Sequence, residues 1–325
     1  MKRMPIQPGH VERLSAGDGT PELSHVFSKD EIDAVDAALA ARRPLLVRGE
    51  PGVGKSQFAQ AAACVLKRAY VQYVVDARTE PSDLLWHFDA VARLAEAQLR
   101  GSAACGCDVE SLRTELAVGN FVEPRPLWWA FHWDDARKQA KGPAPAQPED
   151  CNPANGCVVL IDEIDKAETD VPNGLLEALG MGCFLPPGRS APIKATGKPP
   201  LIVITSNEER ALPDAFVRRC LVLHLRLPTE RQELIDHLVA RAQAHFPLTE
   251  ERAVCAAVLT RAAEMLATDR DTARKQHWLP LPGQAEYLDL VRAVLDLAPT
   301  DTAAQTALLE QVQRFALRKH DGDWG

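Results

Sequence analysis

The stretch LLVRGEPGVGKSQFAQAAA, residues 45–63, constrains this chain more than any other feature of its sequence. It passes from an apolar segment through three glycines into a lysine, a hydroxyl residue and an alanine-rich helical pattern. The apolar segment predicts a buried strand, and the pattern from Lys55 onward predicts a helix. Glycines at such a bend let the backbone wrap around an anion, and the helix N-terminus adds the positive end of its dipole. The stretch therefore predicts a binding site for phosphate groups.

The spacing within the bend narrows the choice of ligand. Residues 49–56, GEPGVGKS, satisfy the pattern G-x-x-x-x-G-K-[ST]. In this pattern the lysine ammonium neutralises the β- and γ-phosphates of a nucleotide, and the hydroxyl ligates Mg²⁺. We therefore expect ATP and Mg²⁺ here, and an ordinary glycine turn is disfavoured by the strand before the bend and the helix after it. The expected nucleotide-binding residues are Gly49, Glu50, Pro51, Gly52, Val53, Gly54, Lys55, Ser56 and Gln57, with Ser56 on the metal.

Composition excludes several classes of protein. The chain has 325 residues, of which 46% are hydrophobic, so it is long and apolar enough for two packed domains. Its formal net charge of -8 gives no overall attraction to nucleic acid or to anionic membranes. The N-terminal MKRMPIQPGH lacks the apolar core of a signal peptide, and no later stretch is long enough to span a membrane. We expect a cytoplasmic protein whose eight cysteines are reduced thiols.

Apolar runs alternate with helical patterns through the first two thirds of the chain. The runs that predict buried strands lie at residues 45–47, 71–75, 158–161, 201–204 and 221–225. This alternation predicts an α/β fold, a parallel sheet with flanking helices. Beyond Pro228 only helical patterns remain, the first with an apolar face from Leu234 to Phe246 and later ones at about residues 250–267, 284–297 and 302–319. They predict a small all-α domain.

These patterns divide the chain into three expected parts. We expect a flexible arm at residues 1–27, an α/β nucleotide-binding core at residues 28–228 and a helical lid domain at residues 229–325. The first core helix should begin at Ser28, where Ser-Lys-Asp-Glu fits a capping box. A Cys- and Pro-rich insertion at about residues 100–156 interrupts the core, and its segment AKGPAPAQPEDCNPANG is expected to be an exposed loop without regular structure.

A second motif supplies what hydrolysis needs. Residues 158–165, VVLIDEID, form an apolar run that ends in adjacent carboxylates. Ligands bind at the carboxyl ends of strands in α/β sheets, so these acids are candidates for the site. We expect Asp162 to hold Mg²⁺ and Glu163 to polarise the attacking water. The alternative is a solvated turn that caps the next helix.

Together, GEPGVGKS and VVLIDEID resemble the Walker A and Walker B motifs of AAA+ ATPases, which are P-loop NTPases. The segments PLWWAF, DKAETDVPNGLLEAL and ITSNEERALPDAFVRRC resemble the MoxR-like branch of that superfamily, and the resemblance covers about residues 28–320. It implies an AAA+ core with a helical lid, ATP hydrolysis and a ring of subunits, expected to be hexameric. It also implies a chaperone-like role on a partner protein, which in relatives is frequently a von Willebrand factor A domain protein.

The resemblance assigns further residues. Asn207 matches sensor 1, which positions the water beside the γ-phosphate, although a turn-favouring Asn is the alternative. Arg218 and Arg219 stand where relatives place an arginine finger that reaches the neighbouring subunit, and Arg219 is favoured because the finger in similar sequences is usually the arginine just before the next strand. The segment PLPGQAEYLDL lacks the sensor 2 arginine that relatives carry at the start of a lid helix. Arg292 is a weak substitute, and a solvent-facing role is the expectation for it.

Other features leave alternatives open. Cys105, Cys107, Cys151 and Cys157 could ligate zinc, but their spacing is poor and free thiols are favoured. The aromatic run PLWWAFHWD is expected to pack in the core rather than to grip a partner, and MGCFLPPG is either a hairpin rising toward a pore or a plain turn. A nucleotide-gated scaffold with little turnover remains an alternative to an ATPase. A nucleic-acid motor is disfavoured by the acidic charge, and a GTPase by the absence of an N-K-x-D or T-K-x-D segment.

Overall fold

The computed structural model describes residues 3–14, 23–102, 109–247 and 256–317. Residue contacts divide the chain into two compact units. The first unit comprises Met1–Ile6, Asp30–Val47 and Ala62–Leu223, and the second comprises Gln7–Lys29, Arg48–Ala61 and His224–Gly325. The segment around the phosphate-binding motif thus groups with the C-terminal helices, whereas the sequence placed it in the α/β core.

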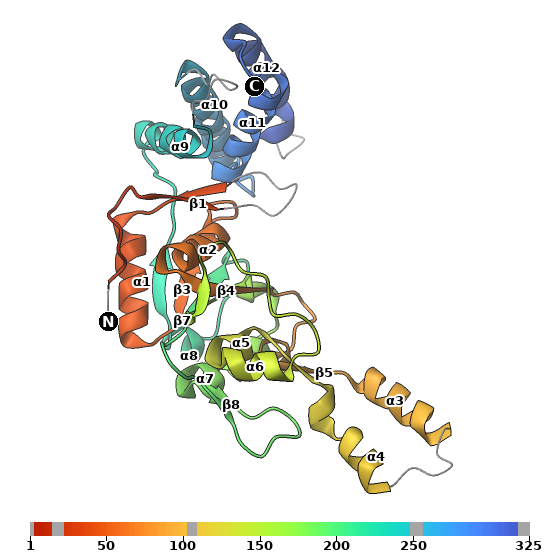
Figure 1. Cartoon of the computed structure of the whole chain (residues 1–325). Coiled ribbons are helices and arrows are strands. Elements are labelled where there is room, and N and C mark those ends of the chain that lie inside the picture. Colours follow the sequence, from red (N-terminus) through yellow and green to blue (C-terminus); the bar gives the residue numbers. More distant parts are fainter. Residues whose placement is uncertain (1–2, 15–22, 103–108, 248–255, 318–325) are drawn as a thin grey trace. The chain divides into compact units, whose positions relative to one another are not determined.

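The centre of the first unit is a five-stranded parallel sheet, as the alternating apolar runs predict. Its order is β11-β3-β10-β7-β4, and Figure 1 labels β3, β4 and β7. The strands are β3 (Leu45–Arg48), β4 (Arg68–Val74), β7 (Asn152–Asp162), β10 (Leu201–Ser206) and β11 (Leu221–His224). In register, Val158 of β7 lies opposite Leu201 of β10 and Tyr70 of β4. All residues of β10 are buried, which explains its uninterrupted apolar run. This confirms the predicted α/β fold class.

Helices of the first unit pack around the sheet. They are α1 (Lys29–Ala41), α5 (Pro126–Phe131), α6 (Trp133–Gln139), α7 (Asp170–Met181) and α8 (Asp214–Val217). Helix α2 (Lys55–Leu66) begins in the second unit. The short 3-10 helices are η1 (Pro81–Leu84), η2 (Val118–Phe121) and η3 (Ile164–Lys166). The aromatic run of α5 packs in the core, as predicted, because Trp128, Trp129 and Phe131 are buried and belong to the same apolar cluster as the sheet residues. The Trp128 indole also donates a hydrogen bond to the Asp135 carboxylate at 2.9 Å.

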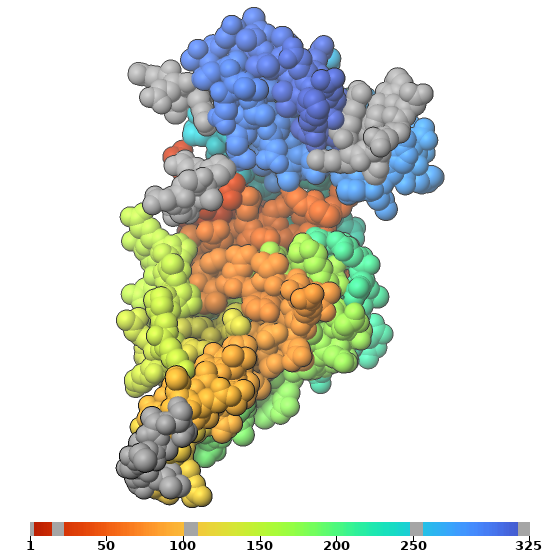
Figure 2. Space-filling view, turned by 90° about the vertical axis from the view of Figure 1, so that its right-hand side faces the viewer, coloured from red at the N-terminus to blue at the C-terminus, as the bar shows by residue number. Residues whose placement is uncertain are grey.

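Residues 109–139 of the expected insertion are largely regular, so that part of the prediction was wrong, and α3 ends where the insertion was expected to begin. Helices α3 (Ala90–Ser102) and α4 (Val109–Glu115) lie side by side and project from the sheet (Figures 1 and 2). Arg93 on α3 donates to the Leu116 carbonyl at 2.9 Å and so ties the two helices together. Strand β6 (Val122–Pro124) pairs antiparallel with β5 (Trp86–Phe88). Helix α4 and strands β5 and β6 are too short for their periodicity to be read from the sequence.

The proline-rich part of the insertion is irregular up to Cys151, and β7 then begins at Asn152. Gln147 anchors this segment, because its side chain accepts from the Tyr70 amide at 2.7 Å and donates to the Tyr70 carbonyl at 3.1 Å. The end of AKGPAPAQPEDCNPANG is therefore strand rather than loop. Parallel pairing with β4 extends this strand beyond its apolar part.

The N-terminal segment also carries structure that the sequence did not predict. Strands β1 (Val11–Leu14) and β2 (Leu23–Val26) pair antiparallel, and both belong to the second unit. Phe27, which is 1% exposed, lies with its ring centroid 6.2 Å from that of Phe58 on α2. This aromatic contact helps to hold a segment whose composition resembles that of a loose arm.

The rest of the second unit is helical, as predicted for the C-terminal part. Its helices are α9 (Arg231–His245), α10 (Ala256–Lys275), α11 (Gln284–Leu297) and α12 (Thr302–Ala316). They share one apolar cluster that includes Leu238, Leu266 and Val291. Helix α10 extends beyond the predicted end near residue 267, through the polar segment TDRDTARK. None of the helices in the described ranges combines the length and apolarity needed to cross a membrane.

Candidate active site

The phosphate-binding motif forms a tight loop between β3 and α2, which begins at Lys55. Gly52 and Gly54 have φ angles of 75° and 97°, a left-handed region that other residues adopt only with strain. The Lys55 side chain is 6% exposed and folds over the loop. Its ammonium donates to the Gly49 carbonyl at 2.7 Å and to the Glu50 carbonyl at 2.9 Å. The loop therefore has the glycine-dependent curvature that the motif predicts.

The base of the loop is packed against the chain that follows β11. A Cβ added to Gly49 would lie 2.2 Å from the Leu225 carbonyl oxygen. The Leu225 amide in turn donates to the Arg48 carbonyl at 2.8 Å. Glycine is required at Gly49 because backbone atoms, which cannot move aside as a flexible side chain can, occupy the space.

The start of α11 also lies against the loop, within the second unit. A Cβ on Gly52 would come 2.8 Å from the Ala285 Cβ, and one on Gly54 would come 3.8 Å from the Gln284 amide nitrogen. Gln284 is 4% exposed, and its carbonyl oxygen lies 3.0 Å from His237 Nε2. A glutamine thus stands at the start of this helix, where the resemblance leads one to look for an arginine.

Arg292, the weak substitute considered from the sequence, contacts its own helix and the end of α9. Its guanidinium lies 3.1 Å from the Asp289 carboxylate and 5.7 Å from the Phe246 ring centroid. We expected this side chain to face solvent, but it is only 24% exposed and therefore half-buried.

The acidic pair of the second motif lies where β7 ends. Asp162 is the last residue of β7, and Glu163 follows with a left-handed φ of 60°. Thr205, a fully buried residue of the neighbouring strand β10, bonds to both acids. Its hydroxyl donates to Asp162 Oδ1 and accepts from the Glu163 amide at 2.8 Å. One threonine hydroxyl therefore fixes both the Asp162 carboxylate and the backbone that carries the Glu163 side chain.

The structure brings two of the predicted catalytic residues into contact. Asn207 follows β10, and its amide nitrogen donates to Glu163 Oε1 at 3.1 Å. The other carboxylate oxygen of Glu163 lies 2.6 Å from the Lys166 ammonium. The hydrogen bond and charge of Glu163 raise the pKa of Lys166 above its ordinary value. Glu163 is therefore held between an amide and an ammonium group at the end of the sheet.

Sequence reasoning missed two residues of this cluster. Thr205 is hidden in the apolar run of β10, and only its hydroxyl in an otherwise apolar strand signals it. Asp165, the second aspartate of VVLIDEID, is 1% exposed. Its carboxylate accepts from the Asn207 amide at 3.3 Å and from the Glu209 amide at 2.9 Å. Asp165 thus fixes the backbone that presents Asn207.

The two candidate arginine fingers follow α8, and both are exposed. Their backbone is held by Arg43, just beyond the end of α1. Its guanidinium donates to the carbonyls of Arg218, Arg219 and Cys220, the last two at 3.0 and 3.3 Å. The structure therefore fixes the main chain of this turn and leaves the Arg218 and Arg219 side chains at the surface.

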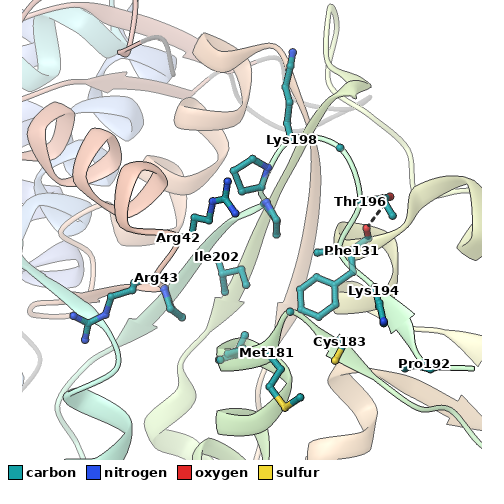
Figure 3. A pocket seen from close by; sticks show the side chains of 18 residues that line it. Arg42, Arg43, Phe131, Met181, Cys183, Pro192, Lys194, Thr196, Lys198 and Ile202 are labelled. Atoms are coloured by element: carbon teal, nitrogen blue, oxygen red, sulfur yellow. Dashed lines mark hydrogen bonds between the residues drawn. The ribbon is translucent and has the colours of Figure 1, made fainter.

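A cavity of about 750 Å³ also lies in the first unit. Its charged lining residues are all cationic: Arg42, Arg43, Lys194 and Lys198. Figure 3 shows that Arg43 and Lys198 point in different directions, so these groups do not converge on a single anion.

Beside this cavity, β8 (Cys183–Phe184) and β9 (Ile193–Lys194) pair antiparallel, which confirms a hairpin after MGCF. Whether this hairpin faces a pore stays a prediction.

The suggested zinc site receives no support from the described part of the chain. Cys105 and Cys107 lie outside the described residues. Cys151 is half-buried, and Cys157 is buried. Within the described ranges, no group of three or more His, Cys, Asp or Glu side chains could hold a metal ion.

Comparison with known proteins shows which family this chain belongs to. Residues 44–241 match the family model of the AAA domain (dynein-related subfamily), which is more than half of the chain. No curated protein matches the chain. It is similar to the solved structure of a mutant RuvB from Thermotoga maritima, with 16% sequence identity over 88% of this chain and 68% of that chain, and a TM-score of 0.45. The family match shows that this chain belongs to the AAA domains of the dynein-related subfamily, within the AAA+ P-loop NTPases.

Proposed function

We propose that this chain is a Mg²⁺-dependent ATPase of the MoxR-like type that assembles into a ring and remodels a partner protein. The observation that carries the proposal is the contact between Glu163 and Asn207, at the ends of neighbouring strands of the parallel sheet. Strand β10 is also the neighbour of β3, and the chain leaves β3 directly into the phosphate-binding loop. Ligands of α/β sheets bind at the carboxyl ends of the strands, which supports a nucleotide site there.

The residues have the donor chemistry that Mg-ATP requires. Ser56 and Asp162 offer hydroxyl and carboxylate oxygens, the ligands that Mg²⁺ prefers. A bound Mg²⁺ would shield the phosphate charge. Lys55 neutralises phosphate oxygens, Glu163 accepts a proton from the attacking water and Asn207 orients that water. Before Glu163 can accept this proton, one of its carboxylate oxygens must contact the water. Either the hydrogen bond from Asn207 or the ion pair with Lys166 must therefore break.

Steady-state phosphate release tests the ATPase proposal. Glu163→Gln should bind ATP as the wild type does but release phosphate about a hundredfold more slowly or less, because the general base is gone. Glu168→Gln is a matched control, since Glu168 is exposed and pairs only weakly with Arg210 at 3.2 Å. Equal turnover by Glu163→Gln and the wild type contradicts the assignment.

The ring proposal rests on the exposed arginines after α8. A finger acting in trans stabilises the transition-state charge in the neighbouring site, so an isolated subunit cannot complete its own site. Mixing provides a sharp test with Arg219→Ala and Glu163→Gln subunits, each inactive alone. The mixture should regain activity, because some neighbouring pairs combine an intact acid with an intact finger. No recovery in a mixture shown to co-assemble contradicts a finger in trans, and recovery with Arg218→Ala instead assigns that role to Arg218.

The proposed partner is a protein, such as a von Willebrand factor A domain protein. Glu163→Gln should retain ATP and therefore hold its partner long enough for capture from the native host. The comparison sample is Lys55→Ala, which should not bind nucleotide and so should not accumulate the same protein. A protein captured equally by both variants does not depend on nucleotide and argues against a remodelling role.

One observation favours a second candidate, a nucleotide-gated scaffold with little turnover. The Lys166 ammonium lies 2.6 Å from Glu163, on the carboxylate oxygen that Asn207 does not contact. If this ion pair persists with nucleotide bound, the base stays engaged and ATP acts as an assembly switch. Near-zero phosphate release by both the wild type and Glu163→Gln, together with ATP-dependent assembly, would favour the scaffold.

A further inference from the structure

Arg270 is a buried arginine of the helical part of the second unit. It lies on α10 and its side chain is 1% exposed. One guanidinium nitrogen donates to both carboxylate oxygens of Glu50, at 2.8 and 2.6 Å. Another donates to the Pro282 carbonyl at 2.8 Å. A single side chain thus joins α10, the segment just before α11 and the phosphate-binding loop.

This ion pair places a charged guanidinium group in a buried position. Burying a guanidinium group is costly unless its charge is paired, and Glu50 supplies the pairing carboxylate. Arg270 Nε is buried without a hydrogen-bond partner among the described residues. Arg270 therefore contacts Glu50 although one of its own N–H groups is left without an acceptor. This points to a role beyond stabilising the helical core.

Glu50 itself needs this partner. It stands inside the loop GEPGVGKS, where a triphosphate must bind, and a free carboxylate there would repel the phosphates. Its own backbone carbonyl accepts from Lys55 at 2.9 Å. The position of Glu50 therefore affects both the charge of the loop and the lysine that closes it.

We propose that Arg270 is a positioning residue that acts through Glu50 to hold the phosphate-binding loop ready for nucleotide. This inference rests on the proposed nucleotide site. It makes nucleotide affinity depend on α10, which the sequence did not identify as part of the site. Because Arg270 holds the loop and does not contact the γ-phosphate, its loss affects ADP and ATP alike.

The test compares Arg270→Gln, Glu50→Gln and the double variant with the wild type. Affinities for ADP and ATP are measured with fluorescent analogues, and turnover is measured in parallel. Each single variant should weaken both nucleotides about tenfold, the loss expected for one hydrogen bond to a charged group. The double variant should be no weaker than Arg270→Gln alone, because both changes break the same contact. Arg261→Gln is the matched control, since Arg261 lies on the same helix and is 53% exposed.

Hydrogen exchange without nucleotide provides a second readout. The amides of residues 50–56 should exchange faster in Arg270→Gln and in Glu50→Gln than in the wild type or in Arg261→Gln. If Arg270→Gln fails to fold, Glu50→Gln still decides the question, because the Glu50 side chain is 46% exposed and Gln keeps an oxygen that can accept a hydrogen bond from the buried Arg270 guanidinium.

Three results would overturn the inference. Wild-type affinity and exchange in Glu50→Gln would mean that Arg270 serves the helical core only. Weaker ATP binding with unchanged ADP binding would place Arg270 on the γ-phosphate instead. Additive losses in the double variant would mean that the two residues act separately. If the wild type itself binds no nucleotide, the proposed function fails as well, and this outcome is distinct from the other three.

Discussion

Removal of the Thr205 hydroxyl tests how the acidic pair is held. Thr205→Val keeps the shape of the side chain and deletes both hydrogen bonds. The Glu163 amide loses its acceptor at 2.8 Å, which costs about 1–3 kcal/mol, and the Asp162 carboxylate loses a donor, which costs about 1.5–3 kcal/mol. The added buried methyl group offsets about 1 kcal/mol. We therefore expect the free energy of unfolding to fall by about 3 kcal/mol.

The same change should lower turnover, because Thr205 orients both the metal ligand and the general base. We expect phosphate release to fall at least about tenfold with ATP affinity nearly unchanged. Thr205→Ser is the control, since it keeps the hydroxyl and loses only a methyl group, at a cost of about 1 kcal/mol. Urea denaturation and a phosphate-release assay measure the two effects. A Thr205→Val protein within about 0.5 kcal/mol of the wild type and fully active would refute this account of the acidic pair.

Two further predictions concern the second unit. Gly49→Ala should destabilise the protein by about 3 kcal/mol or more and abolish nucleotide binding, because the added Cβ would lie 2.2 Å from the Leu225 carbonyl oxygen. Thermal and urea unfolding measure the loss of stability. Gly180→Ala is the control, since a Cβ at Gly180 would meet nothing within 4 Å. His245 has its pKa lowered to about 4, first by burial and then by the charge of Arg292, so the folded state binds fewer protons than the unfolded state between about pH 6.5 and 4. Stability from this group is therefore lost as the pH falls through that window, by about 2 kcal/mol at pH 5, and denaturation of His245→Asn should lack this component.

The fold class could be predicted because its signals are local. Each strand of the sheet is a short apolar run next to a turn or a helical pattern, and parallel pairing leaves these runs buried on both faces. The elements that were missed lack such signals. Helix α4 has only seven, mostly polar, residues, and the β1–β2 pair is held by contacts with residues distant in sequence, such as those of Phe27 with Phe58 and of Val26 with Arg241.

The candidate site was predictable where a motif fixes spacing, as in residues 49–56 and residues 158–165. The contact of Glu163 with Asn207 agrees with roles assigned from two separate segments. The residues that hold these groups were not predictable, because their function depends on neighbours distant in sequence. Thr205 acts across a strand pair, and Arg270 reaches Glu50 from 220 residues away along the chain. No sequence pattern marks such a contact.

Calorimetric titration with Mg-ATP tests the central claim most directly. The account predicts that the folded wild-type protein binds one nucleotide per chain, and that Lys55→Ala abolishes the heat of binding, since Lys55 supplies the charge that faces the phosphates. Circular dichroism should confirm that both proteins are folded. A folded wild type that releases no heat of binding, or a Lys55→Ala protein that binds Mg-ATP as tightly as the wild type, would contradict the claim.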